Sequence, residues 1–231
     1  MCSSDLFSQH LGYSGFPKLQ REIRQRVKKD LLIRPKEAEI EESVTGIASK
    51  AMQDVWLALE QTRISLDTEA LGKLVEQMGV ARRIVIIPEG PAQPSAYSLV
   101  LFLEEGGFPV YIARGGIADL ARTVNIATPQ DLLIAMEVAG QSPYIARALG
   151  QAQERGIPTA ALVSSASLAS ARFADTVLAA QAHTTIGVGI VSIETVVFAL
   201  AQVLRWRFAD RFAGTEQAIS ELTEKIQQPV D

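Results

Sequence analysis

Cysteine, histidine and long apolar runs are all scarce in this chain of 231 residues. Cys2 is the only cysteine, so no disulfide can form within one chain, and His10 and His183 are too few to indicate a structural zinc site. Apolar runs such as 132–135 and 196–204 are much shorter than the roughly 20 residues that a membrane-spanning helix needs. The N-terminus also lacks the basic-then-apolar order of a secretory signal. We therefore expect a cytoplasmic globular protein with no membrane span, no metal and no cofactor.

Charge is distributed unevenly along the chain. The formal net charge is −4, but the first 36 residues carry eight basic and three acidic side chains, a local charge of +5 that leaves −9 for the rest. A basic segment on an acidic body suits binding to a phosphate backbone. A solvated basic helix explains the same charge equally well, so both interpretations stay open.

The N-terminal part of the chain is predicted to be helical. A turn signal with two glycines and a proline leads into a helical stretch at 18–29. Apolar residues then recur at helical spacing over 40–59, which predicts a long connecting helix within 36–66. Asp67 is a suitable N-cap for a further helix that ends near Gly79.

The middle of the chain alternates short apolar runs with helical stretches. Because the runs are continuously apolar, they indicate strands buried on both faces, as in a parallel sheet covered by helices. We predict an α/β fold: a three-layer α/β/α sandwich with a five-stranded parallel sheet and flavodoxin-like topology over 67–210, followed by a C-terminal helix within 211–231. The expected strands are 84–87, 110–113, 132–138, 159–163 and 176–179, and the expected helices are 94–105, 117–124, 143–155, 168–173, 192–208 and 215–227.

Three strand-to-helix loops, at 88–95, 137–142 and 163–167, could form a binding site. Right-handed crossovers bring the carboxyl ends of parallel strands and the following helix N-termini to one edge. Backbone N–H groups there can bind an anion, and hydroxyls in the loops can hydrogen-bond a phosphate or a sugar. Glycine and serine in such loops are also ordinary turn residues. The candidate ligand-binding residues are Gly90, Ala92, Gln93, Ser95, Glu137, Gly140, Gln141, Ser142, Ser164 and Ser165.

The order of these strands, loops and helices over 67–210 resembles the SIS (sugar isomerase) domain. The stretch 7–19, FSQHLGYSGFPKL, is similar to the end of the helix-turn-helix domain of RpiR-family transcription regulators, where the recognition helix ends in an aliphatic-Gly-aromatic-Ser-Gly-Phe motif. The resemblance implies a remnant of a DNA-binding domain over 1–35, with Lys18 and Arg21 as DNA-binding candidates. It also implies a sugar phosphate or another carbohydrate derivative as ligand, and a homodimer.

The loops depart from the family pattern. Ala92 stands where the first loop usually has serine, Val163 stands where the third usually has threonine, and Glu-Val-Ala-Gly-Gln-Ser at 137–142 replaces Ser-x-Ser-Gly-x-Thr. A carboxylate beside a phosphate costs about 1 to 4 kcal/mol at roughly 4 Å. The ligand is then a neutral or cationic sugar derivative that Glu137 binds, or the pocket has lost its ligand and the domain only dimerises. A third interpretation is that Glu137 points to solvent or caps the next helix.

The helix-turn-helix part is incomplete. About ten residues precede Gly12, too few for the supporting helix that this motif needs. We therefore expect weak or absent DNA binding by this chain, with DNA a partner only where the missing head is present. An alternative is that the apolar side chains of this segment simply dock on the main domain; these are Leu6, Phe7, Leu11 and Phe16.

An enzyme of this fold would need a general base near the sugar. Weak candidates are Glu137, His183 and Glu194, although the dipole at a helix N-terminus explains Glu194 without catalysis. The lost hydroxyls and the regulator-like N-terminus favour a ligand-sensing regulator, with an aldose-ketose phosphosugar isomerase as the alternative. The apolar helix faces at 40–59 and 190–208, with Trp56, Trp206 and Phe208, predict self-association as a dimer.

Overall fold

The computed structural model describes residues 43–180 and 185–227. The chain divides into two compact units, 1–52 and 53–231. The described part of the first unit is little more than the beginning of helix α3 (Val44–Ser65), and the second unit contains the sheet. Several sequence-based expectations lie outside the described residues: the helix at 18–29, the apolar segment before it, and the candidates Lys18, Arg21 and His183.

The second unit is built on an all-parallel sheet of five strands in the order β2-β1-β3-β4-β5. Val85 in β1 pairs with Tyr111 in β2 on one side and with Leu133 in β3 on the other. This is the flavodoxin-like strand order, and it confirms the predicted fold class. The strands are β1 (Arg83–Pro88), β2 (Val110–Ile112), β3 (Asp131–Glu137), β4 (Thr159–Val163) and β5 (Thr176–Ala179).

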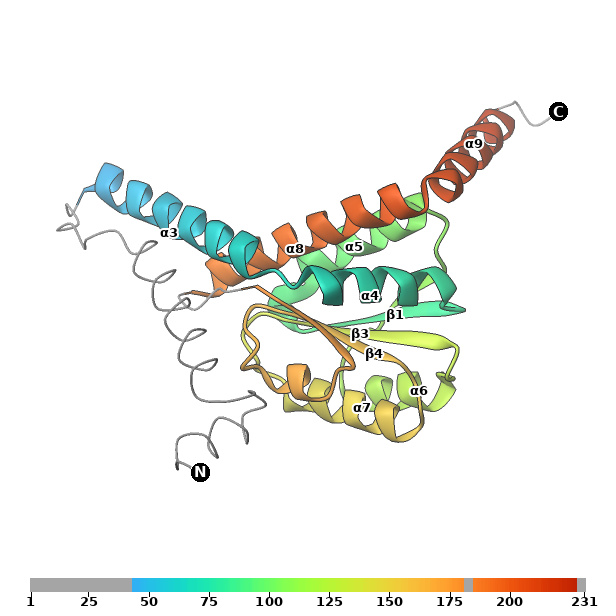
Figure 1. The fold of residues 1–231 in the computed structure, drawn as a ribbon, viewed down its shortest axis with the longest axis horizontal. Coiled ribbons are helices and arrows are strands. Elements are labelled where there is room, and N and C mark those ends of the chain that lie inside the picture. The colour runs from blue at the N-terminus through green and yellow to red at the C-terminus, as the bar shows by residue number, and fades with distance from the viewer. Residues whose placement is uncertain (1–42, 181–184, 228–231) are drawn as a thin grey trace, which may run out of the picture. The chain divides into compact units, whose positions relative to one another are not determined.

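Helices cover both faces of the sheet (Figure 1). Helices α4, α5 and α8 lie on one face, and α6 and α7 lie on the other. Asp67 caps α4 as predicted, because its carboxylate accepts the N–H groups of Glu69 and Ala70. The elements are α4 (Thr68–Val80), η1 (Gly90–Ala92), α5 (Gln93–Glu105), α6 (Ile117–Ile126), α7 (Pro143–Glu154), η2 (Ala169–Arg172), α8 (Ile186–Arg207) and α9 (Ala209–Ile226).

The central strands are buried on both sides. Ile84, Ile86 and Ile134 pack in the cluster under α4, α5 and α8, whereas their neighbours Val85 and Leu133 pack in the cluster above α6 and α7. Successive side chains of a strand point to opposite faces, so both sets of positions must be apolar. This two-sided burial is the reason that the strand sequences are continuously rather than alternately apolar.

Helix α8 begins six residues earlier than its apolar pattern predicts. Thr185 is its N-cap, and the Thr185 side chain accepts the N–H of Val188 at 3.3 Å. Glycines in its first turn weaken the helical signal in the sequence. Gly189 is required by packing, because a Cβ there would lie 2.8 Å from Cγ1 of Val138. The first turn of α8 therefore packs directly against the loop that follows β3.

Helix α9 also begins earlier than predicted, at Ala209 rather than 215. Its start is docked on the second unit, because the Arg211 guanidinium donates to the carbonyls of Gly106 at 2.9 Å and Gly107 at 2.8 Å. Arg211 also lies 3.9 Å above the ring centroid of Phe108, and Phe212 is buried in the core. These tertiary contacts fix the start of α9, where no side chain caps the helix.

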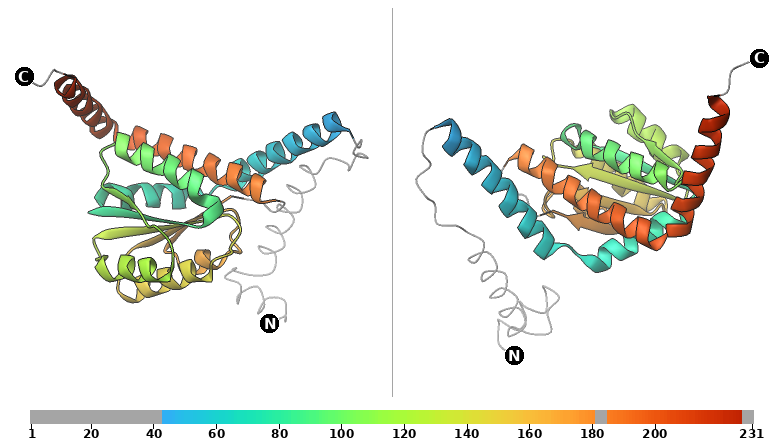
Figure 2. Two further views of the ribbon diagram at one scale, coloured as in Figure 1. Left: turned by 180° about the vertical axis from the view of Figure 1, so that it is seen from behind. Right: turned by 90° about the horizontal axis from the view of Figure 1, so that it is seen from above.

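Helix α8 is long and apolar enough to cross a membrane by length and composition alone. Its buried residues, however, belong to the core under the sheet, including Ile193, Val197 and Leu200 at 0% exposure. Figure 2 shows α8 running beside α5 over the sheet. A core helix explains this composition, since one face packs inward while the outer face still carries exposed Phe198 and Trp206.

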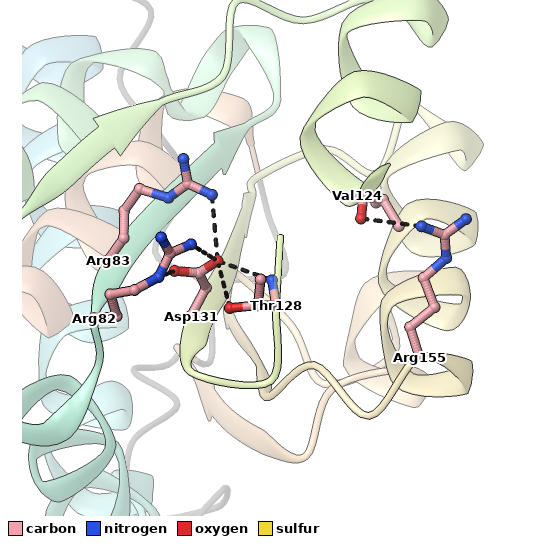
Figure 3. Close-up of polar contacts among 6 residues, drawn as sticks. All are labelled: Arg82, Arg83, Val124, Thr128, Asp131 and Arg155. Atoms are coloured by element: carbon pink, nitrogen blue, oxygen red, sulfur yellow. Dashed lines mark hydrogen bonds and ion pairs between the residues drawn. The ribbon is translucent and has the colours of Figure 1, made fainter. Parts of the chain in front are cut away.

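The amino-terminal edge of the sheet is held by a charged cluster around Asp131 (Figure 3). Its buried carboxylate accepts from Arg82 Nε at 3.0 Å and Nη2 at 2.7 Å, and from the N–H of Thr128 at 2.9 Å. Arg83 adds a longer contact at 3.3 Å. Burial opposes ionisation, but these donors outweigh it and hold the pKa of Asp131 below its ordinary value. The cluster joins β1 to β3 at the edge opposite the candidate site.

Candidate functional site

The three loops singled out from the sequence meet at the carboxyl edge of the sheet. The third loop is tied to the second, because Ser164 Oγ donates to the carbonyl of Val138 at 2.6 Å and the Ser164 N–H donates to the carbonyl of Glu137 at 3.0 Å. The first is tied to the second through Glu89, whose N–H donates to the carbonyl of Met136 in β3 at 2.8 Å and whose carboxylate accepts the N–H of Val138 in the second loop. The predicted convergence of the loops is therefore confirmed.

The Glu89 carboxylate lies in the turn of the second loop. Its Oε2 accepts the N–H groups of Val138 at 2.9 Å, Ala139 at 2.8 Å and Gly140 at 3.2 Å, and its Oε1 accepts the N–H of Gln141. Four consecutive amides thus converge on one carboxylate that is only 3% exposed. Such a run of amides forms an anion-binding concavity, and a charged acceptor makes each hydrogen bond stronger.

Glycine is needed at the centre of this amide turn. Gly140 has a φ of +66°, a conformation that residues with a Cβ rarely adopt. A Cβ at this position would also lie 2.7 Å from Cδ2 of Leu168. Pro143 then occupies the first position of α7, where its missing N–H costs nothing. The positive φ of Gly140 therefore lets the backbone turn so that the N–H groups of 138–141 point at Glu89.

Glu137 is buried at the end of β3, and whether it contacts a ligand stays a prediction. Its side chain is 1% exposed and accepts a hydrogen bond from Ser170 Oγ in η2. The expectation that it points to solvent or caps α7 is wrong, because strand β3 carries it inward against η2. Burial is the main cause that raises the pKa of Glu137, and the neighbouring Glu89 charge adds to it, although Ser170 opposes both.

The other candidate residues divide into surface and buried groups. Gly90, Gln93, Gly140 and Gln141 are exposed and Ser142 is partly exposed, so these residues form an uncharged rim. Ala92 and Ser95 are fully buried, and the Ser95 hydroxyl has no hydrogen-bond partner among the described residues. The hydroxyl of Ser164 is used within the protein, as described above, and Ser165 Oγ lies 2.9 Å from Ser167 Oγ. Which of these residues contact a ligand stays a prediction.

Glu89 and Ser170 are the site residues that sequence reasoning missed. Glu89 lies within the loop at 88–95 and Ser170 within the helical stretch predicted at 168–173, but neither residue forms a motif by itself. A usable signal was present at Glu89, because it follows a buried apolar strand directly and no Lys, Arg or His occurs in 88–95, 137–142 or 163–167. A carboxylate in that position needs another source of positive charge, and backbone amides supply it.

Glu194 is not where the sequence placed it. Because α8 begins at Ile186, Glu194 lies in the third turn rather than near the helix start. The dipole of a helix acts within its first turn, so the earlier explanation for this residue is wrong. Within 43–180 and 185–227, no three His, Cys, Asp or Glu side chains gather as a metal site would require.

A five-stranded parallel sheet in flavodoxin-like order, covered by helices on both faces, defines a doubly wound α/β domain. The sequence model of the SIS domain matches residues 77–205. The chain therefore belongs to the SIS domain family. No match was found among curated protein sequences.

Solved structures share this fold. The sugar isomerase domain of an RpiR transcription factor from Sphaerobacter thermophilus is 25% identical, with a TM-score of 0.67 over 75% of this chain and 98% of its own. The Vibrio vulnificus NanR protein complexed with ManNAc-6P is 16% identical, with a TM-score of 0.68 over 98% of this chain and 81% of its own. A phosphoheptose isomerase from Francisella tularensis is 14% identical, with a TM-score of 0.60 over 71% and 99% respectively.

Proposed function

We propose that this chain is the ligand-sensing and dimerising part of an RpiR-type transcription regulator, and that its ligand is a carbohydrate derivative. The observation that carries the proposal is the joining of the three loops at the carboxyl edge of the sheet. The sugar isomerase domain of an RpiR transcription factor supports it, because that domain has the same fold and its sequence is 25% identical to this chain. That similarity covers nearly the whole of the RpiR domain. The NanR complex with ManNAc-6P supports the ligand class, since it has the same fold.

The site favours sensing over catalysis. An isomerase needs a base that reaches the sugar, yet Glu137 is buried against Ser170. Glu194 lies on the third turn of α8, away from the helix start that would face the loops. The exposed rim of Gly90, Gln93 and Gln141 offers amide groups, which bind hydroxyls and do not transfer protons at neutral pH. Neither of the two candidate bases within the described residues is placed to reach a sugar, so an aldose-ketose isomerase is the less favoured function; the third candidate, His183, lies outside the described residues.

A homodimer is part of the proposal. The outer faces of α5 and α8 carry large exposed apolar side chains, including Leu101 at 62% and Phe198 at 57%. Trp56 and Trp206 are exposed as well. Phe208, which was expected on this surface, instead packs inward against the core, with its ring 5.8 Å from that of Phe108. Burying such side chains in a two-fold interface would remove them from water.

The remaining parts of the proposal concern organisation. We propose a cytoplasmic regulator divided into a helix-turn-helix remnant at 1–35, a connecting helix at 36–66, the SIS domain at 67–210 and a C-terminal helix at 211–231. Binding to DNA would require the head of a regulator of this type, with Lys18 and Arg21 near its end.

A ligand screen with a turnover control tests the proposed function. The unfolding midpoint would be measured with neutral sugars, amino sugars and sugar phosphates, since a ligand at about 100 times its dissociation constant adds about 2.7 kcal/mol of stability. The same mixtures would be followed by NMR for aldose-ketose conversion. We expect stabilisation by at least one carbohydrate derivative and no conversion. Isomerisation of any of these sugars, or a screen with no stabilising sugar, would overturn the proposal.

A further inference from the structure

The amide turn at 138–141 already holds an anion that belongs to the chain itself. Its four N–H groups are directed at the Glu89 carboxylate, three of them at 2.8 to 3.2 Å from Oε2. A phosphate group that bound this loop would need the same amides. Two anions cannot share one set of donors, so a phosphorylated ligand would first have to displace Glu89.

Displacement of Glu89 is opposed by its surroundings. The side chain is 3% exposed and arises directly from the end of β1, so it is already held beside its donors without loss of translational freedom. The four amides hold Glu89 in place even though the buried Glu137 carboxyl is its neighbour there. No Lys, Arg or His in 88–95, 137–142 or 163–167 could receive a displaced Glu89 carboxylate.

We propose that Glu89 is a specificity-determining residue that excludes phosphate from the amide turn, so that the carbohydrate ligand of this domain carries no phosphate group there. This inference rests on the proposed function for the identity of the ligand, but its physical basis is the occupied turn alone. The ligand class is then an uncharged or amino sugar derivative. Hydroxyl groups of such a ligand meet the amide side chains of Gln93 and Gln141 on the exposed rim.

Removing the internal anion should convert the turn into a phosphate site. In Glu89→Ala the four amides lose their acceptor, and we expect inorganic phosphate to raise the unfolding midpoint in a saturable way at constant ionic strength. Since one charge-assisted hydrogen bond corresponds to about tenfold or more in a binding constant, the variant should bind phosphate at least about tenfold more tightly than the wild type. Acetate should also stabilise the variant, because its carboxylate can replace the one that the substitution removes.

The matched control is Glu137→Gln, which removes a buried ionisable carboxyl group from the same region and leaves the turn occupied. This variant, like the wild type, should show no saturable response to phosphate. Equal phosphate binding by the wild type and Glu89→Ala, or no phosphate response in Glu89→Ala, would overturn the inference. A response in Glu137→Gln as large as in Glu89→Ala would do the same, because net charge would then explain the effect.

A second measurement needs no substitution and decides the question if Glu89→Ala fails to fold. Backbone amide NMR of the wild type should show the signals of Val138, Ala139, Gly140 and Gln141 unmoved by inorganic phosphate. Saturable shifts of these four signals would mean that phosphate displaces Glu89, which overturns the inference but leaves a phosphosugar sensor possible. Isomerisation in the turnover control would overturn the proposed function and leave the occupied turn unchanged, so the two failures are distinguishable.

Discussion

Glu89→Gln should destabilise the fold by an amount that follows from its hydrogen bonds. The amide oxygen of glutamine can still accept the three N–H groups now on Oε2, but its NH₂ group cannot accept the N–H of Gln141. The three retained bonds change from charge-assisted to neutral, a loss of about 1 kcal/mol each. Relief of repulsion with Glu137 and of desolvation offsets part of this, so we expect a net loss of about 2 kcal/mol.

Urea unfolding followed by circular dichroism would measure this loss. The midpoint should fall while the slope of the transition stays unchanged, because the surface exposed on unfolding is the same. Glu137→Gln is the matched comparison, since it makes the same substitution at a buried carboxyl group whose partner is Ser170 instead of four consecutive amides. If Glu89→Gln were as stable as the wild type, the amide turn would not be stabilising a charge, and our account of the site would be wrong.

Two further predictions concern buried carboxylates and pH. The folded-state pKa of Glu137 is raised. Its favourable contribution to the free energy of unfolding is therefore fully present below the ordinary glutamate pKa of about 4.3 and is lost as the pH rises through the folded-state pKa. Glu137→Gln should therefore gain stability over the wild type as the pH rises from about 5 to 8; a gain that does not change with pH would contradict this. The folded-state pKa of Asp131 is lowered. Its contribution to the free energy of unfolding is therefore present above the ordinary aspartate pKa of about 3.9 and is lost as the pH falls through the folded-state pKa. Asp131→Asn should lower the free energy of unfolding by about 2 to 3 kcal/mol at neutral pH. This is less than the loss on breaking a fully buried ion pair, because Arg82 is half exposed. Urea unfolding at neutral pH and near pH 3 should show the Asp131→Asn deficit shrinking in acid, and an equal deficit at both would refute the assignment.

The sheet and most helices could be predicted because their signals are local. Each strand is a continuous apolar run, and Asp67 is a recognisable cap that the structure confirms. The starts of α8 and α9 could not be predicted in the same way. Gly189 is explained by close packing against Val138, and the start of α9 depends on Arg211 reaching the carbonyls of Gly106 and Gly107. Both causes are contacts between segments distant in sequence.

The candidate site shows the same division. The convergence of its loops followed from parallel strand order, which the sequence indicates. The role of each carboxylate did not follow, because Glu89 directly follows one buried strand and Glu137 ends another, so the two look alike in the sequence. Glu89 meets four consecutive backbone amides, whereas Glu137 meets the hydroxyl and the backbone of Ser170, and these partners come from other segments of the chain.

The amino-acid sequence by itself determined the layered α/β architecture, since the spacing of apolar residues selects buried strands and amphipathic helices regardless of distant contacts. Only the tertiary structure decided that the anion-binding turn is filled from within. A carboxylate's environment depends on the donors that folding brings to it, and the amides of 138–141 lie about fifty positions away from Glu89 along the chain.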